Sequence, residues 1–478
     1  MTMALHDKDD EQHRQQLERM KTLNSSETSK DPQSVPSDII IEILSRLPVK
    51  SLLRIRSVCK LWFSIISDPH FVKSHLSLST SNNRYAHHRL ILSTNSISVH
   101  SCPLYDVLYD GIVKALEIDY PEPLDSVQIY GCCNGLFLIA NRDRDLFIWN
   151  PSTRRSNRLP CSGSGGLPVS YNFGYDESSD DYKVVGIYYV YKGEAEYDAI
   201  VKMYSLKTAN WKRIGDFHNG FSMDCCVQYL NGVLHWTTIQ NCESSYTWTI
   251  ARVGFISFQS PLSCILQFSN MKVAGCFIPL SIINVKGPKL LVCLEPPNFL
   301  SRPTIASLDL AKETYGEILQ PAYDEGYMDL NMGALRECLC VLYDHHGRNS
   351  ADVWVMKVYG VKDFWTKLVS IPYPIGRPVY GFSVPLCISN DGKVLLQHGS
   401  ELVVYDSKNC SSSEIQNFNE YAEPYSFVES LVSPDSQALE IANRLDIKEK
   451  LAFLRRCLVK FFLPGCFKNR FEPVGRTD

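Results

Sequence analysis

Residues 36–66 read PSDIIIEILSRLPVKSLLRIRSVCKLWFSII, and this stretch decides the fold of the N-terminal part of the chain. The spacing i, i+3, i+4, i+7 of one helical face is met by Ile40, Ile43, Leu44 and Leu47. Ile39 and Ile41 make other faces apolar as well, which a lone surface helix does not tolerate. A block this short cannot bury its own apolar surface, so it indicates a partner protein rather than a reaction.

Local signals divide the block and its continuation into three short helices. Ser37 can cap the first helix, and Leu47-Pro48 ends it because the residue before proline avoids helical geometry. A second helix is expected from Ser51, and Asp68-Pro69 combines a cap with proline at the first position of a third. An ordinary helical subdomain packed on the rest of the chain is the alternative interpretation.

The ordered string of residues resembles the F-box of plant F-box proteins. The matching elements are Pro36, Asp38, Ile43-Leu44, residues 46–52 (RLPVKSL), Arg56, Val58-Cys59-Lys60 and Trp62. The resemblance implies docking on the Skp-type adaptor and, through it, on the cullin of a ubiquitin ligase. The residues implied at or behind that contact are Pro36, Ile40, Leu44, Leu47, Pro48, Leu52, Val58, Cys59 and Trp62. Some of them must hold the helices together instead, and the sequence does not divide the two groups.

Composition restricts the classes of partner. With 478 residues the chain has room for two or three domains, and its 45% hydrophobic and 21% charged residues are typical of globular proteins. A net charge of −4 provides no basic field for nucleic acid, so we expect no nucleic-acid partner. No apolar signal core is evident at the N-terminus, which indicates a cytoplasmic or nuclear protein. We expect residues 1–34 to be disordered.

The 17 cysteines do not form a metal-binding pattern. Cys132-Cys133, Cys225-Cys226 and the pair Cys338/Cys340 lack zinc-ligand spacing with histidines. We therefore expect reduced, mostly buried thiols, no metal site and no cofactor.

From about residue 85 the pattern becomes that of β-strands. An apolar strand, a short polar turn and a second strand with Trp or Tyr recur every 45–55 residues, the period of propeller blades. Two-residue hairpins are indicated at Asn134-Gly135, Asn231-Gly232 and Asp391-Gly392. The stretch RLILSTNSISVHSC near the start and YSFVESLVS near residue 425 are expected to pair and close the ring. We predict six blades, with five and seven as the alternatives.

These segments resemble the F-box-associated interaction domain of the same plant family, which is often named F-box/kelch-repeat. The resemblance rests on CNGL at Cys133, WNPSTR at Trp149, YKVV at Tyr182, YSLKTANWK at Tyr204 and NGVLHW at Asn231. The fold expected is thus multidomain: a small all-α F-box at 35–79, an all-β propeller at 85–432, and a tail at 433–478 with a basic amphipathic helix. The double glycine of kelch repeats is not regular in this chain.

Residues 238–304 depart from the family pattern. They separate NGVLHW from the strand IASLDLAKETYGEI that normally follows soon after it. One interpretation is an additional pair of strands or a large loop on one blade. The other is a non-coding segment translated in the gene model. Prolines at 261, 279 and 288 argue against a membrane span.

No catalytic constellation stands out in the sequence. CSGSGGLP at Cys161 lacks the Lys-Ser/Thr of a phosphate loop, and DESSDD at Asp176 is interpreted as a solvated turn. Tryptophans in strand-like contexts are expected to pack between blades. We do not expect the tail to contact a membrane, although acylation at Cys457 or Cys466 is the alternative.

The function predicted is therefore that of a non-catalytic substrate receptor of a Skp–cullin–F-box ubiquitin ligase. The F-box would bind the adaptor, and the propeller would bind an unknown target protein through residues that the sequence does not identify. A propeller enzyme or sugar-binding module, and an F-box scaffold acting outside a ligase, are the alternatives.

Overall fold

The computed structural model describes residues 37–435, apart from gaps at 83, 95–97, 112–113, 119, 121–126, 164–166, 194–195, 216–226, 240–248, 256–269, 274–275, 280, 284–289, 296–302, 322–327, 346–349, 373–382, 399–400 and 416–421. Two compact units are present: Met1–Leu44 with Leu451–Asp478, and Ser45–Lys450. The expectations for the N-terminal 34 residues and for the C-terminal helix lie outside the described residues.

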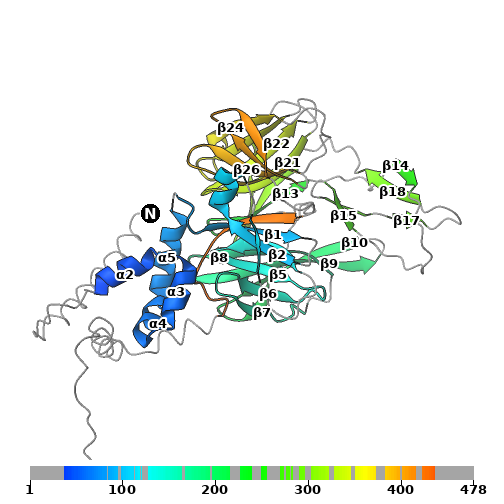
Figure 1. Cartoon of the computed structure of the whole chain (residues 1–478). Coiled ribbons are helices and arrows are strands. Elements are labelled where there is room, and N and C mark those ends of the chain that lie inside the picture. The colour runs from blue at the N-terminus through cyan, green and yellow to red at the C-terminus, as the bar shows by residue number, and fades with distance from the viewer. Residues whose placement is uncertain are drawn as a thin grey trace, which may run out of the picture. The chain divides into compact units, whose positions relative to one another are not determined.

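Four helices precede the strands, where three were expected (Figure 1). They are α2 (Ser37–Ser45), α3 (Val49–Arg56), α4 (Lys60–Ile66) and α5 (Pro69–Thr80). The predicted second helix is interrupted because the Ser57 hydroxyl donates to the Arg54 carbonyl, while Cys59 adopts an extended conformation. The predicted cap of α5 is confirmed: the Asp68 carboxylate accepts hydrogen bonds from the backbone N–H groups of His70 and Phe71, at 2.9 and 3.3 Å.

Six four-stranded antiparallel sheets form the blades of a propeller. Blade 1 contains β29 (Ala422–Val428), β1 (His88–Thr94), β2 (Ser98–Pro103) and β3 (Leu116–Glu117). Blade 2 contains β4 (Gln128–Cys133), β5 (Leu136–Ala140), β6 (Leu146–Asn150) and β7 (Arg155–Arg158). Blade 3 contains β8 (Leu167–Asp176), β9 (Asp181–Gly193), β10 (Glu196–Ser205) and β11 (Asn210–Arg213).

The remaining three blades complete the set. Blade 4 contains β12 (Gln228–Leu230), β13 (Val233–Ile239), β19 (Pro303–Asp309) and β20 (Thr314–Ile318). Blade 5 contains β21 (Met328–Leu335), β22 (Cys338–His345), β23 (Ser350–Met356) and β24 (Trp365–Pro372). Blade 6 contains β25 (Ser383–Ile388), β26 (Lys393–His398), β27 (Glu401–Asp406) and β28 (Ser411–Glu414).

The ring is closed within blade 1. The first strand of each blade contacts the first strand of the next, in the order β29, β4, β8, β12, β21, β25 and back to β29. β29 pairs with β1 in a register that sets His88 opposite Val428 and Thr94 opposite Ala422. The predicted closure and the count of six blades are confirmed.

The segment 238–304 lies between two paired strands of blade 4. β13 pairs directly with β19, with Val233 opposite Asp309 and Ile239 opposite Pro303, so the blade is complete without the intervening residues. Within the segment, β14 (Thr249–Phe255), β17 (Ser281–Ile283) and β18 (Leu290–Glu295) form one small sheet, and β15 (Asn270–Val273) pairs with β16 (Cys276–Pro279).

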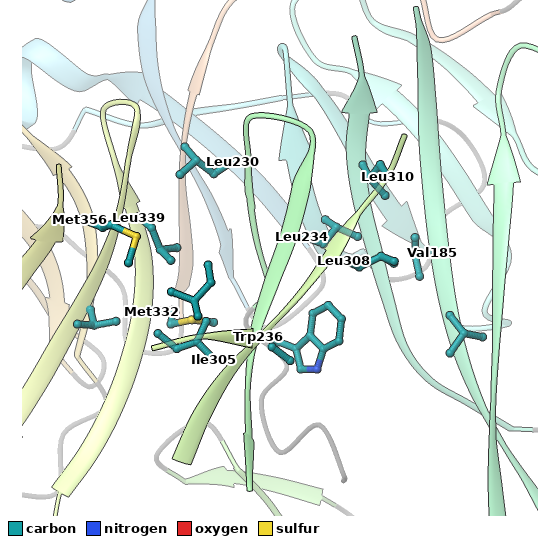
Figure 2. Packing of buried hydrophobic residues seen from close by; sticks show 14 of the residues in the cluster. Val185, Leu230, Leu234, Trp236, Ile305, Leu308, Leu310, Met332, Leu339 and Met356 are labelled. Carbon is teal, nitrogen blue, oxygen red and sulfur yellow. The ribbon is translucent and has the colours of Figure 1, made fainter. Parts of the chain in front are cut away.

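Apolar side chains from neighbouring blades fill the spaces between them. Figure 2 shows Trp236 of blade 4 with Val185 of blade 3 on one side and Met332 of blade 5 on the other, all from one buried cluster. Of the five tryptophans expected to pack, Trp149, Trp236 and Trp365 are 0%, 4% and 7% exposed, whereas Trp211 and Trp354 are only partly buried against the clusters.

Two of the three predicted hairpin turns have the expected geometry. Both residues have positive φ at Asn134-Gly135 (52° and 78°) and at Asn231-Gly232 (48° and 80°). The third prediction was wrong in detail. A four-residue loop joins β25 to β26, and of the Asp391-Gly392 pair only Gly392 has positive φ.

Candidate functional site

Helix α2 presents isoleucines to solvent. Ile39, Ile41 and Ile43 are 50%, 42% and 55% exposed, whereas Leu44 on the same helix is 3% exposed. Ile40 is half-buried. Three exposed isoleucines on one nine-residue helix form a concentration of apolar surface that indicates a protein contact.

The segment from Pro48 to α4 also contains both exposed and buried side chains. Pro48 is exposed, and Val58 and Phe63 are 49% and 45% exposed. Leu52, in contrast, is fully buried, together with Val49 of the same helix. The half-buried side chains are those of Leu47, Cys59 and Trp62.

The exposed fractions divide the predicted contact residues into buried and exposed ones, a division that the sequence did not provide. Leu44 and Leu52 are buried, while Pro48 and Val58 are exposed. Pro36 lies outside the described residues. Sequence reasoning had omitted Ile39, Ile41, Ile43 and Phe63 from the candidate contact; the signal for the isoleucines was the apolar character of several helical faces over residues 39–44.

His75 of α5 anchors the turn that precedes α3. Its side chain is fully buried, and its Nε2 atom lies 2.9 Å from the carbonyl oxygen of Leu47. The ring also meets that of His87 edge-on, with 5.6 Å between centroids. Desolvation lowers the pKa of His75, with the Leu47 carbonyl opposing the shift, so the ring is neutral and donates to that carbonyl at pH 7.

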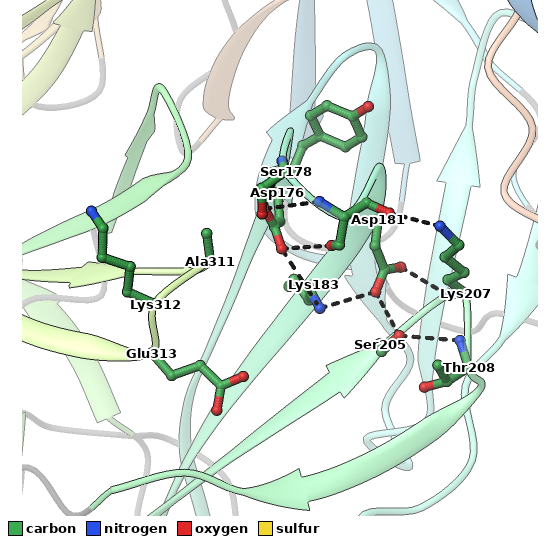
Figure 3. A network of polar contacts seen from close by, with 12 residues as sticks. Asp176, Ser178, Asp181, Lys183, Ser205, Lys207, Thr208, Ala311, Lys312 and Glu313 are labelled. Atoms are coloured by element: carbon green, nitrogen blue, oxygen red, sulfur yellow. Dashed lines mark hydrogen bonds and ion pairs between the residues drawn. The ribbon is translucent and has the colours of Figure 1, made fainter. Parts of the chain in front are cut away.

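Acidic residues at the β8–β9 turn form a buried network (Figure 3). Asp176 accepts hydrogen bonds from the hydroxyls of Ser178 and Ser179, at 2.7 and 2.5 Å. Burial opposes ionisation of Asp176, but hydrogen bonds, first those of Ser179 and Ser178, outweigh it and lower its pKa. Asp181 accepts from Ser205 and from the backbone N–H of Lys207, and lies 3.1 Å from the Lys183 ammonium.

The predicted solvated turn is present, with Glu177, Ser178 and Asp180 exposed, but the aspartates at its two ends are buried. Asp176 and Asp181 are 4% and 3% exposed. Their carboxylates take the place of water by accepting hydrogen bonds from backbone N–H groups of two adjacent turns. Asp180 is the accessible member, and it pairs with Lys73 of α5 at 2.8 Å, where both side chains are about half exposed. Among the described residues no group of His, Cys, Asp and Glu is arranged to hold a metal ion.

A second exposed apolar group lies on blade 5. The turn between β23 and β24, residues 357–364, exposes Val358, Tyr359, Val361 and Phe364 at 40–48%. The turn is held in place because the Tyr359 hydroxyl lies 2.7 Å from Nε2 of His235, a fully buried side chain of blade 4. Its exposure and fixed geometry are those of a surface that can contact another protein.

A short helical module followed by a closed six-bladed propeller defines an F-box substrate-adaptor architecture. The chain matches the F-box domain family over residues 33–74 and the F-box associated beta propeller domain family over residues 91–299. It belongs to the F-box proteins that carry this propeller domain.

Relatives from Arabidopsis thaliana cover most of the chain. The F-box protein CPR1 is 30% identical over 408 residues, which are 80% of this chain and 85% of the relative. An F-box/kelch-repeat protein is 29% identical over 395 residues, which are 80% of this chain and 89% of the relative.

Solved structures are similar at a much lower level. YCF48 bound to D1 peptide has a TM-score of 0.35 and 7% identity, with 70% of this chain and 79% of the other covered. The propeller domain of the Trilobed protease from Pyrococcus furiosus has a TM-score of 0.33 and 8% identity, with coverage of 70% and 82%. In the part of the chain that the structure describes, no helix has the length and hydropathy to cross a bilayer.

Proposed function

We propose that the chain is the substrate-recognition subunit of a Skp–cullin–F-box ubiquitin ligase. The observation that carries the proposal is the exposure of Ile39, Ile41 and Ile43 on α2, inside the stretch that matches the F-box family. These side chains and Val58 are the proposed contacts to the Skp-type adaptor. Leu44 and Leu52 support the contact from the interior.

The propeller is the proposed target-binding part. The exposed turn of blade 5 offers Tyr359 and Phe364, and aromatic side chains frequently dominate the energy of protein interfaces. A specific interface buries roughly 1,600 Å² in total, so further residues must contribute to target binding.

We extend the proposal to the division of the chain into domains: an F-box at 35–79, a propeller at 85–432 and a separate tail.

The contribution of the chain to the reaction is proximity. A target bound to the propeller and an adaptor bound to the F-box are held in one complex, which raises the effective concentration of the target lysine near the charged conjugating enzyme. Proteins of this architecture are generally non-catalytic adaptors, and we propose that this chain performs no chemistry of its own.

Co-purification tests the proposal. The full-length chain is expressed with an affinity tag in plant cells, and the adaptor and cullin are measured in the eluate. The wild type should retain both, and Leu47→Ala/Pro48→Ala should reduce both. Failure of the wild type to retain the adaptor would refute the ligase role, whereas retention of the adaptor without cullin would favour a scaffold outside the ligase.

The target is identified by a second measurement. Proximity labelling is performed with and without proteasome inhibition, using the wild type and a Tyr359→Ala/Phe364→Ala variant. A target should accumulate in the labelled fraction on inhibition and be lost in the variant. If the propeller is instead an enzyme or a sugar-binding module, no labelled protein should accumulate when the proteasome is inhibited.

A further inference from the structure

Two arginines lie close together between helix α3 and blade 2 without a carboxylate partner. Arg56 is the last residue of α3, and Arg155 is the first residue of β7. Among the described residues, neither guanidinium has an ion pair with an acidic side chain. Both side chains line the same cavity, and burial, followed by the positive charge of Arg155, lowers the pKa of Arg56.

The Arg56 side chain is held in place with hydrogen-bonding capacity unused. Its guanidinium lies over the Phe63 ring, 4.5 Å from the centroid, an arrangement that fixes the plane of the group. Its Nε atom is buried and has no acceptor among the described residues. A buried charged donor without an acceptor costs free energy, which an anion could recover.

Blade 2 contributes a hydroxyl to the same place. The Thr153 hydroxyl is also buried and has no hydrogen-bond partner in the part of the chain that the structure describes. Its turn is rigid, because Asn150 accepts hydrogen bonds from the N–H groups of Ser152 and Thr153 and donates to the carbonyls of Ser430 and Val432. The turn is thereby tied to the segment that follows β29.

These groups surround a cavity of about 390 Å³. Arg56, Phe63, Thr153, Arg155 and Ser433 are among its lining residues, and no Asp or Glu lines it. The volume is within the range of small-molecule sites. Two guanidinium forks and a hydroxyl are donors that suit a tetrahedral oxyanion, and arginine bonds phosphate in bidentate fashion.

We propose that this cavity binds the phosphate group of a small phosphorylated ligand, through the guanidinium groups of Arg56 and Arg155 and the hydroxyl of Thr153. The ligand neutralises the two adjacent cations and connects α3 of the F-box to blade 2. Binding therefore stabilises the folded chain, since a ligand that binds only the native state raises the free energy of unfolding.

The test uses the full-length chain with inorganic phosphate as the probe. Thermal unfolding is measured in phosphate, acetate and chloride at equal ionic strength, and the ³¹P linewidth of phosphate is recorded with the protein. Phosphate should raise Tm above its value in the other two salts and show a broadened resonance. Arg56→Gln and Arg155→Gln should each weaken phosphate binding by about tenfold or more, as the loss of one charge-assisted contact predicts.

Arg158→Gln is the matched control. Arg158 lies on the same strand as Arg155, but its guanidinium is already paired with Asp145 at 2.8 Å. This variant should respond to phosphate as the wild type does. If Arg56→Gln does not fold, Arg155→Gln still tests the proposal, because Arg155 is at an exposed position.

Three results would overturn the proposal. They are no effect of phosphate beyond that of chloride, an equal effect of acetate, and an undiminished response in Arg155→Gln.

Discussion

Nε2 of His75 lies 2.9 Å from the main-chain oxygen of Leu47, 28 positions earlier in the chain. The Leu47 carbonyl belongs to the turn between α2 and α3, so α5 helps to fix the position of the exposed Pro48 through this hydrogen bond. His75→Phe should leave that carbonyl unsatisfied and lower the free energy of unfolding by about 1–3 kcal/mol. Urea unfolding checks this value, and His70→Phe at an exposed position of the same helix is the control. Equal losses in both variants would contradict the role assigned to His75.

The division of the F-box into exposed and buried residues predicts two kinds of variant. Ile43→Asp and Val58→Asp should weaken adaptor binding by about tenfold or more while leaving the free energy of unfolding within about 0.5 kcal/mol. Leu52→Ala should instead cost about 2–5 kcal/mol of stability, because it leaves a cavity at a fully buried position. Adaptor affinity and urea unfolding, measured on the same samples, separate these effects. Unchanged adaptor affinity in both exposed variants would remove these side chains from the contact.

Stability should fall on mild acidification because of His235. Its Nδ1 atom faces the Gln228 carbonyl at 3.2 Å, so the neutral ring carries its proton there and accepts the Tyr359 hydroxyl at Nε2. Burial lowers its pKa from 6.5 to about 4, so below pH 6.5 the unfolded state binds the proton more readily. This contribution to the free energy of unfolding is complete above pH 6.5 and is lost as the pH falls toward 4. At pH 5 the loss is about 2 kcal/mol.

His235→Gln tests this dependence. Urea unfolding at pH 7 and pH 5 should show a smaller loss on acidification in the variant than in the wild type. His88, whose pKa burial also lowers to about 4, accounts for part of the loss that remains. An identical loss in variant and wild type would assign the acid sensitivity to other groups.

Two lysine–aspartate pairs at the β8–β9 turn, one formed with Lys73 of α5 and one within blade 3, should differ in their effect on stability. Lys73 and Asp180 are about half exposed, so Lys73→Ala should cost less than about 1 kcal/mol. Asp181→Ala should cost about 3 kcal/mol or more, since it leaves Lys183 and the Lys207 amide without their buried acceptor. Chemical denaturation of each variant gives the comparison. A larger cost for Lys73→Ala than for Asp181→Ala would contradict the burial argument.

The long segment in blade 4 should be dispensable for folding. Because β13 pairs with β19 along its whole length, replacing residues 243–299 by a short glycine-containing turn should preserve the cooperative unfolding transition. Circular dichroism during heating measures this. Mapping of transcripts across codons 238–304 decides separately whether the segment is translated, and its absence from spliced transcripts would refute the insertion.

The architecture was predictable where a local pattern is repeated. Asn134-Gly135 and Asn231-Gly232 require positive φ, and they located two inner hairpins correctly. The break between α3 and α4 was missed, because it depends on one serine hydroxyl that binds a carbonyl instead of extending the helix. The burial of Asp181 was missed because its partners, Ser205 and Lys207, come from a turn about 25 residues away.

The candidate site was only partly predictable. A helical pattern identifies apolar positions, but the choice between Leu44 and Ile43 as the exposed one depends on tertiary packing. The proximity of Arg56 and Arg155 could not be anticipated, since 99 positions separate them.

The pairing of β29 with β1 makes the first blade depend on a strand that is synthesised after all the other strands of the described residues. During translation the F-box leaves the ribosome first, while β1 waits for residues 422–428 before its edge is covered. A product truncated before Ala422 would retain the adaptor-binding helices beside an open strand edge, which invites association with other chains. Such a product would occupy the adaptor without a completed ring, and would act as a competitor of the full-length protein rather than as a weaker copy of it.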